Sequence, residues 1–240
     1  MNAEGEGIIL SQYLITNKNI NWETKKSNLL VDNIYHISFL NHNNYFVVKE
    51  LFSSESELYH VKNGNWKLNY HPFANQIDAI HAISENLIWI AGYSEVALLK
   101  GDSWERIKLP TPIFSAKKIF GNKKKQMWLL TNSGVLYFYD GINWKQHLTK
   151  QKIIEVHFKD VNDVYALSKN SIYRIENLKE KILLTDEILS NVKGIFSVSE
   201  NDIKLIGNNG LLLSYKNKSL NKILLPTNED LNAIYLNDGL

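Results

Sequence analysis

Residues 87–104 read LIWIAGYSEVALLKGDSW, and residues 127–144 read MWLLTNSGVLYFYDGINW. Each stretch has a tryptophan in a short apolar run, then a turn, a second apolar run, and a glycine three residues before a final tryptophan. Trp89 and Trp128 are 39 residues apart, and the two final tryptophans are 40 residues apart. Two tryptophan series with nearly the same period indicate an internal repeat of about 40 residues.

The repeat extends beyond these two copies. Trp66 continues the series of final tryptophans toward the N-terminus. Toward the C-terminus, residues 164–168 (VYALS) and 203–207 (IKLIG) continue the other series, with Tyr165 and Lys204 in the tryptophan position. Because a binding residue has no reason to recur in every copy, we expect the tryptophans to pack between neighbouring repeats.

The apolar segments within each repeat are predicted to be β-strands. They are about 5–7 residues long, which is short for helices, and they are rich in Ile, Val, Tyr, Phe and Trp. Asn-Gly and Asp-Gly pairs, which favour the positive φ of hairpin turns, separate several of them. Four strands in a repeat of about 40 residues predict an all-β fold, a β-propeller. The four prolines fall between the repeats, where no ladder N–H is needed: Pro72, Pro110, Pro112 and Pro226.

The whole chain, 1–240, is predicted to be a single propeller of about six four-stranded blades. Five complete blades are expected at approximately 33–72, 77–110, 115–149, 153–185 and 192–226. Residues 230–240 resemble the opening of a further copy and residues 7–26 the closing half of one. We therefore expect both chain ends to share the last blade, which would leave no exposed strand edge. The competing interpretation is a fragment of a longer propeller.

Composition excludes several functional classes. The chain has 44% hydrophobic and 22% charged residues, as a folded globular protein does. No cysteine is present, which excludes disulfides, thiolate metal sites and a cysteine nucleophile. The 27 basic and 25 acidic residues nearly balance, and Arg106 and Arg174 are the only arginines, so no nucleic-acid partner is predicted. No apolar run is long enough to span a membrane. The abundance of Lys, Asn and Ile indicates an AT-rich, bacterial genome.

Residues 88–104 carry the pattern apolar-Trp-apolar-apolar-Gly, turn, apolar strand and Gly-x-x-Trp. This pattern resembles the repeats of bacterial sensor-ectodomain propellers of the two-component-regulator type and of photosystem II assembly-factor-like propellers. The resemblance covers nearly the whole chain, implies a recognition platform and transfers no catalytic residue to it. The chain departs from the photosystem group in lacking an Arg patch. Residues 137–144 also resemble the Asp-box of sialidases, but Gly141 follows Asp140 directly, and two arginines cannot form a sialidase Arg triad.

Candidate ligand-binding residues are expected on one face of the propeller. The turns between the second and third strands and the connections between blades emerge together on this face, around the channel. Their residues differ from copy to copy, unlike the repeated tryptophans, although many are also common turn formers. The candidates are Tyr70, His71, Tyr93, Glu95, Thr111, Asn132, Asn170 and Asn208.

Four further candidates lie in the first strands, which line the channel of a propeller. His36, His81 and His157 are offset from one another by one residue each along their strands, so we expect alternate ones to point to opposite faces. This offset argues against a shared metal site, and neither a metal nor a cofactor is predicted. Glu155 and His157 have the spacing of an acid–base couple on one face, but no nucleophile motif accompanies them.

The sequence therefore predicts a non-catalytic propeller that binds a ligand across its loop face or channel mouth. A protein or peptide is the first partner expected, and a carbohydrate the second. The alternatives are a propeller-type hydrolase or lyase acting on carbohydrate, with Glu155, His157 and His81 at the channel, and a sensor ectodomain cut from a larger receptor. For the compartment, the expectation is extracytoplasmic, either periplasmic or secreted.

Overall fold

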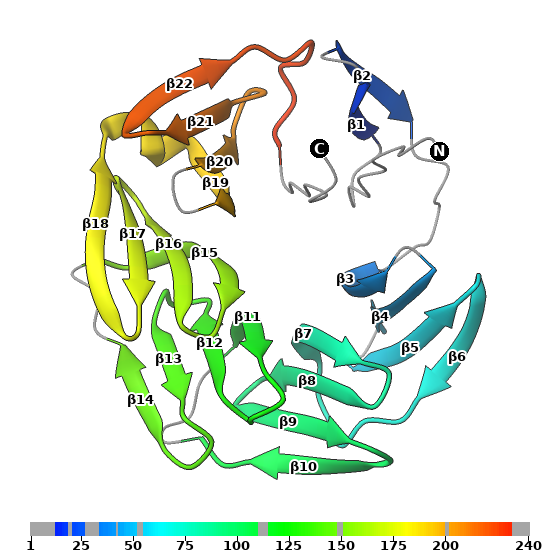
Figure 1. The fold of residues 1–240 in the computed structure, drawn as a ribbon. Helices are drawn as coiled ribbons and strands as arrows, with labels where there is room; N and C mark the ends of the chain where they lie inside the picture. The colour runs from blue at the N-terminus through cyan, green and yellow to red at the C-terminus, as the bar shows by residue number, and fades with distance from the viewer. Residues whose placement is uncertain are drawn as a thin grey trace. The chain divides into compact units, whose positions relative to one another are not determined.

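A computed structural model describes residues 13–18, 21–26, 34–41, 43–51, 55–109, 115–147, 151–199 and 202–231, the first two ranges by their backbone alone (Figure 1). These residues form five four-stranded antiparallel sheets and one two-stranded pair. Within each sheet, four consecutive strands follow one another through hairpins, and each strand pairs with the next. This arrangement is the blade of a β-propeller, so the predicted fold class is confirmed.

The sheets are numbered as blades in chain order. Blade 1 contains β3 (Ile34–Asn41), β4 (Asn44–Glu50), β5 (Ser56–Lys62) and β6 (Asn65–Asn69). Blade 2 contains β7 (Ile77–Ser84), β8 (Leu87–Gly92), β9 (Glu95–Lys100) and β10 (Ser103–Ile107). Blade 3 contains β11 (Ala116–Gly121), β12 (Met127–Thr131), β13 (Leu136–Tyr139) and β14 (Trp144–His147).

Blade 4 contains β15 (Ile153–Asp160), β16 (Asp163–Ser168), β17 (Ser171–Glu176) and β18 (Lys179–Thr185). The short 3-10 helix η1 (Glu187–Asn191) connects it to the next sheet. Blade 5 contains β19 (Val192–Ser199), β20 (Asp202–Gly207), β21 (Leu212–Lys216) and β22 (Ser219–Ile223). The separate pair consists of β1 (Tyr13–Lys18) and β2 (Asn21–Lys26).

The described residues hold five complete blades, one fewer than the six predicted. Of the proposed closing blade, residues 13–18 and 21–26 form the hairpin β1–β2. Residues 7–12 and 232–240 lie outside the described residues, so a blade that joins both chain ends stays a prediction. The chain divides into two compact units: a three-blade unit, Val31–Lys150, and a two-blade unit, Met1–Leu30 with Gln151–Leu240.

In the three-blade unit, the first strands lie on the inner side of the sheets and the fourth strands form the outer edges (Figure 1). Strand β7 contacts both β3 and β11, so the three first strands are neighbours. Apolar side chains fill the space between consecutive sheets: Phe46 and Val48 of blade 1 pack with Ile88 and Ile90 of blade 2. Burial of these faces accounts for the apolar composition of the central strands.

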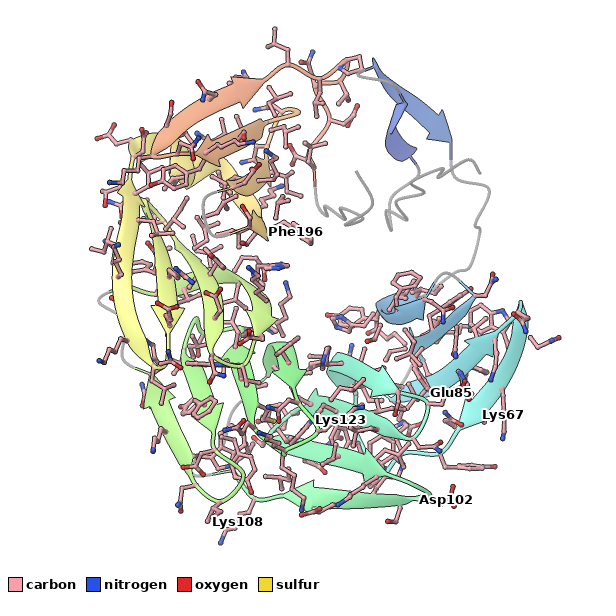
Figure 2. All side chains as sticks on the ribbon, in the orientation of Figure 1. Lys67, Glu85, Asp102, Lys108, Lys123 and Phe196 are labelled. Atoms are coloured by element: carbon pink, nitrogen blue, oxygen red, sulfur yellow. The ribbon has the colours of Figure 1, made fainter. Side chains whose placement is uncertain are left out.

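Trp89, Trp104 and Trp144 connect neighbouring blades, as their spacing predicted, whereas Trp66 is 42% exposed and its ring contacts Tyr59 of its own blade. Trp89 is fully buried, in one cluster with residues of blade 3. Trp104 and Trp144 lie on fourth strands, and each indole donates a hydrogen bond to a carbonyl just after the fourth strand of the preceding blade. The Trp104 Nε1 lies 2.8 Å from the Tyr70 carbonyl oxygen, and the Trp144 Nε1 lies 2.8 Å from that of Lys108. Figure 2 labels Lys108. In blades 2 and 3, the final tryptophan of the repeat therefore links its blade to the preceding one by a hydrogen bond.

The two-blade unit follows the same plan with one exception. Tyr165, in the tryptophan position of blade 4, is fully buried in a cluster with Ile195 and Leu205 of blade 5. Lys204 occupies this position in blade 5, where its ammonium bonds Asp202 at 2.6 Å and the Ser214 hydroxyl at 2.8 Å. The aromatic packing position is thus replaced by a polar cluster in the last complete blade.

Candidate functional site

The first strand of every complete blade contains a β-bulge at its second residue. The pairing of each first strand with its second strand skips one residue there. A bulge leaves the extra residue out of the ladder and re-aims its side chain, and bulges are frequent beside functional sites. The five bulged residues differ in chemistry although their backbone position is the same: Tyr35, Asp78, Lys117, Ile154 and Lys193.

Three of these residues form what we call the rim of the three-blade unit: Tyr35, Asp78 and Lys117. They begin three neighbouring first strands, at the end where the connections between blades arrive. Tyr35 is 48% exposed, and its ring meets the ring of His36 edge-on at 4.7 Å between centroids. The rim therefore presents an aromatic ring, a carboxylate and an ammonium on equivalent backbone positions.

Asp78 is held by residues at the start of the next blade. Its Oδ2 accepts hydrogen bonds from the Ser115 hydroxyl at 2.9 Å and from the Ala116 N–H at 3.2 Å. The Asn132 side-chain amide in turn donates to the Ser115 hydroxyl at 2.7 Å. Burial raises the pKa of Asp78, and the two hydrogen bonds oppose that rise. A relay from Asn132 through Ser115 thus orients a half-buried carboxylate.

The two-blade unit repeats this device with the charges reversed. The ammonium of the bulged Lys193 lies 2.7 Å from the carboxylate of Asp230, which also accepts the Asn209 N–H at 2.9 Å. The hydrogen bond from Lys193 lowers the pKa of Asp230. As in blade 2, the bulged side chain reaches the segment that follows its own blade. In blades 2 and 5 the bulged side chain therefore links the blade to the segment that follows it.

The structure gives turn and linking roles to most of the predicted loop-face residues. Asn132 belongs to the relay above. The Asn208 N–H donates to the Asn191 carbonyl at 3.0 Å, and the Asn170 carbonyl accepts the Asp186 N–H at 2.9 Å. Both asparagines therefore hold a second-to-third-strand turn against a connection between blades, Asn170 against the connection that follows its blade and Asn208 against η1, which precedes its blade.

The remaining loop-face candidates lie in the β8–β9 hairpin and in the connections between blades. Tyr70 is 87% exposed and follows the outer strand β6, and His71 donates from Nε2 to the Ser56 carbonyl at 2.8 Å. Glu95 accepts a hydrogen bond from Arg106 at 2.7 Å, and Arg106 also donates to the Pro72 carbonyl. Tyr93 is half-exposed in the β8–β9 turn, and Thr111 lies outside the described residues.

The channel histidines lie differently from the prediction. His81 pairs with Trp89 and His157 pairs with Tyr165, so these two histidines occupy the same position in their blades. The predicted one-residue offset between them is wrong: each lies four residues after the first residue of its strand, and the bulge falls at the same place in both strands. His81 contacts Phe120 of the next blade with ring centroids 4.4 Å apart, and His157 contacts Phe196 at 4.3 Å. Figure 2 labels Phe196 on the first strand of blade 5.

His36 and Glu155 share a second position in the first strands. His36 pairs with Val48 and Glu155 with Leu167, two residues along the second strand from the tryptophan position. Glu155 and His157 therefore share one face of β15, as predicted. The Glu155 carboxylate accepts the Val156 N–H at 2.9 Å, and His157 packs on the next blade. Both side chains therefore make contacts within the blades.

Burial lowers the pKa of His36 and the pKa of His81 to about 4 from an ordinary value of 6.5. The unfolded chain therefore binds protons to both groups at a higher pH than the folded chain does. We expect the unfolding temperature to fall as pH decreases from 6.5 toward 4. Over this interval each histidine lowers the free energy of unfolding by up to about 1.4 kcal/mol per pH unit.

The variant His81→Phe tests this expectation, because Phe120 fills the equivalent position of the next blade. Its unfolding temperature should depend less on pH than that of the wild type in thermal melts over the same interval. An equal pH dependence in both proteins would contradict the assignment of His81 as a neutral buried group.

Among the described residues, no group of three or more histidine, aspartate and glutamate side chains can hold a metal ion. No helix in the described part of the chain is long and apolar enough to cross a membrane. The sequence reasoning missed Tyr35, Asp78 and Ser115 as site residues. The signal for Tyr35 and Asp78 was weak, since it consisted of a changing residue one place after the first apolar residue of each repeat, and Ser115 lies just before the first strand of blade 3.

Comparisons with known proteins address the fold. No protein-family model matches the chain, and no curated protein matches it in sequence. Among solved structures, YCF48 bound to D1 peptide has a TM-score of 0.61 at 14% identity, covering 88% of this chain and 74% of that one. Virginiamycin B lyase from Staphylococcus aureus has a TM-score of 0.64 at 12% identity, covering 81% and 71%. The WD40 repeats of RRP9 have a TM-score of 0.63 at 7% identity, covering 80% of this chain and 65% of that one. At these identities the likeness shows the β-propeller fold.

Proposed function

We propose that this propeller is a peptide- or protein-binding module, and that the rim of the three-blade unit is its binding site. The loop-face residues nearest the rim, Asn132 and Tyr93, extend the surface. In this proposal the blades serve as a scaffold, and no bond is made or broken in the bound partner.

The observation that carries the proposal is the contrast between a constant backbone and a changing side chain. The same bulge recurs at the second residue of each first strand, while the residue there is tyrosine in blade 1, aspartate in blade 2 and lysine in blade 3. In repeat proteins, positions that vary on a constant scaffold form the binding surface. An aromatic ring beside opposite charges suits a peptide, which offers apolar and charged side chains together.

The comparisons support the proposal at the level of the fold. One similar propeller is solved with a bound peptide, and another is a WD40 domain. Their low sequence identity transfers no residue role to this chain. They support the idea that a propeller of this size and arrangement can present a peptide site.

A random dodecapeptide library on phage, selected against the whole chain, tests the proposal. We expect selected peptides to bind the wild type and to lose affinity by at least about tenfold in Tyr35→Ala, since exposed aromatic anchors dominate interfaces. Ile142→Ala is the matched control, because Ile142 is 82% exposed in the β13–β14 turn at the other end of its blade.

The proposal fails if no peptide is enriched over bare support, or if Ile142→Ala weakens binding while Tyr35→Ala does not. A glycan array run with the same three proteins addresses the carbohydrate alternative. Glycan binding that depends on Tyr35, without peptide binding, would favour a carbohydrate as the ligand.

A lyase is the second candidate, because one of the similar propellers is a virginiamycin B lyase and another structure of it contains quinupristin. In this chain the proposed acid–base couple would be Glu155 and His157 on β15. Incubation with quinupristin, followed by liquid chromatography, tests this candidate. Consumption of quinupristin by the wild type, and its loss in His157→Gln, would support catalysis.

A further inference from the structure

The Asp78 carboxylate accepts its hydrogen bonds on one of its two oxygens. Both donors that hold the side chain, the Ser115 hydroxyl and the Ala116 N–H, bond to Oδ2. In the described part of the chain, Oδ1 accepts no hydrogen bond. The side chain is half-buried at the start of β7, at the end of the blade where the connection arrives. A fixed carboxylate therefore presents a free oxygen at the rim.

This carboxylate is oriented before any partner arrives. The Asn132 amide, the Ser115 hydroxyl and Oδ2 form a chain of two hydrogen bonds, of 2.7 and 2.9 Å. A group already held in its binding orientation loses little freedom when a ligand is bound. A charged donor on an ionised carboxylate makes a stronger hydrogen bond than a neutral donor does, and partial burial strengthens it further. The free Oδ1 is thus best matched by a cation that can donate a hydrogen bond.

The neighbouring blade adds an aromatic surface for the same cation. Tyr35 occupies the equivalent bulge on β3, which contacts β7, and nearly half of its surface is exposed. The face of a tyrosine ring attracts ammonium and guanidinium groups. His36, whose ring supports Tyr35, adds no opposing charge at neutral pH because burial lowers its pKa to about 4. Lys117 occupies the equivalent bulge on β11 of blade 3, where its positive charge disfavours a second cation.

We propose that the rim selects a lysine or arginine side chain of its peptide partner, with the Asp78 carboxylate as the ion-pair acceptor and the Tyr35 ring as the flanking surface. The inference rests on the proposed function, because it specifies which residue of the bound peptide the rim recognises. Asn132 acts as a positioning residue through Ser115, without touching the partner.

The peptides selected on the wild-type chain supply the test. We expect them to share a lysine or arginine, and we expect Asp78→Asn to weaken binding about tenfold or more in fluorescence polarisation. Asp102→Asn is the matched control, because it removes the same charge from an exposed turn at the other end of blade 2. Replacing the shared lysine of the peptide by norleucine should weaken its binding to the wild type about as much as Asp78→Asn weakens binding of the lysine peptide. The same replacement should change binding to the Asp78→Asn protein little.

The outcomes separate the inference from the proposed function. Peptides that bind through Tyr35 but show no preference for lysine or arginine would overturn the inference and leave the peptide site standing. Equal affinity of wild type and Asp78→Asn would overturn it as well. Failure to select any peptide would remove both. If Asp78→Asn does not fold, the norleucine substitution on the wild-type protein decides alone, and an unchanged affinity would overturn the inference.

Discussion

Replacing Trp89 with alanine is expected to lower the free energy of unfolding by about 3–5 kcal/mol, the usual cost of truncating a large buried aromatic side chain. Trp89 is 0% exposed and lies in the cluster that joins blades 2 and 3, with Ile119 and Met127. Its removal deletes packing on both sides of the space between the blades. Chemical denaturation followed by circular dichroism measures the loss.

Gly121 gives this prediction a second variant. A Cβ atom added at Gly121 would lie 2.3 Å from the indole Nε1 of Trp89, far inside van der Waals contact. The indole is rigid and buried, so Gly121→Ala should destabilise the wild type by about 1–3 kcal/mol, as overpacked cores do. In Trp89→Ala the space is vacant, and the same substitution should cost much less.

Trp66→Ala is the control, because this tryptophan is 42% exposed on the outer strand β6. Its effect should be clearly smaller than that of Trp89→Ala. Equal effects would show that the buried position has no special part in joining the blades. Additive effects of Trp89→Ala and Gly121→Ala would contradict the close approach of the indole to the glycine.

The repeat could be predicted because aromatic packing between blades leaves a periodic mark in the sequence. Trp89, Trp128 and Tyr165 occupy one buried position in successive blades, and Trp104 and Trp144 share a second, half-buried position. Each is large and apolar for the same physical reason, so their spacing shows the blade length. Lys204 breaks the series, and its ion pair with Asp202 could not be foreseen from one substitution.

The rim could not be predicted because it depends on register. A bulge adds one residue to a strand without changing its composition, and no residue type requires it. The sequence therefore does not show that the Asp78 side chain leaves the ladder, and no role was predicted for Asp78. Asn132 was singled out as a loop residue, but its hydrogen bond to Ser115 depends on the approach of two segments that only the folded blades bring together.

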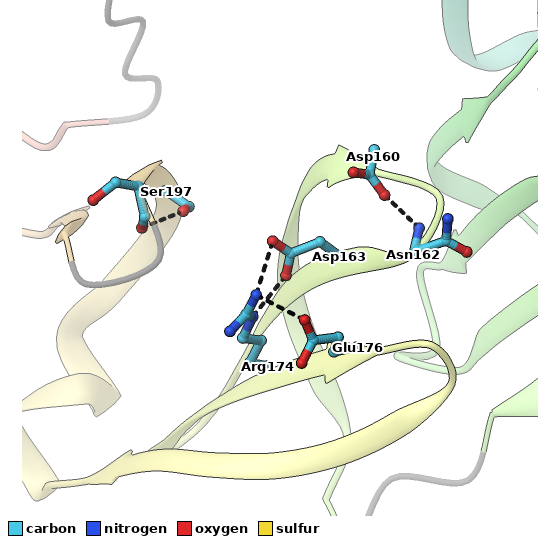
Figure 3. A network of polar contacts seen from close by, with 7 residues as sticks. Asp160, Asn162, Asp163, Arg174, Glu176 and Ser197 are labelled. Atoms are coloured by element: carbon cyan, nitrogen blue, oxygen red, sulfur yellow. Dashed lines mark hydrogen bonds and ion pairs between the residues drawn. The ribbon is translucent and has the colours of Figure 1, made fainter.

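Asp163→Ala is the second substitution from which we expect a large effect. Arg174 donates to both carboxylate oxygens of Asp163, from Nε at 2.8 Å and from Nη2 at 3.3 Å (Figure 3). The two side chains are only 14% and 13% exposed, and the guanidinium lies 5.9 Å from the centre of the Tyr165 ring. Removing Asp163 takes two hydrogen bonds from a poorly solvated guanidinium and leaves Glu176 as its exposed partner, so the cost should approach that of breaking a buried ion pair, about 3–5 kcal/mol.

The exposed member of the same network provides the control for this expectation. Glu176 bonds Arg174 Nη2 at 3.1 Å, but its side chain is 56% exposed, so Glu176→Ala should change the unfolding free energy by less than about 1 kcal/mol. Replacing both buried partners, as Asp163→Leu with Arg174→Met, should restore most of the stability that Asp163→Ala loses, because no charge then stays buried. Denaturation curves of the four proteins separate these cases. If the double variant were as unstable as Asp163→Ala, the loss would come from packing in blade 4 and not from a guanidinium that has lost its buried carboxylate partner.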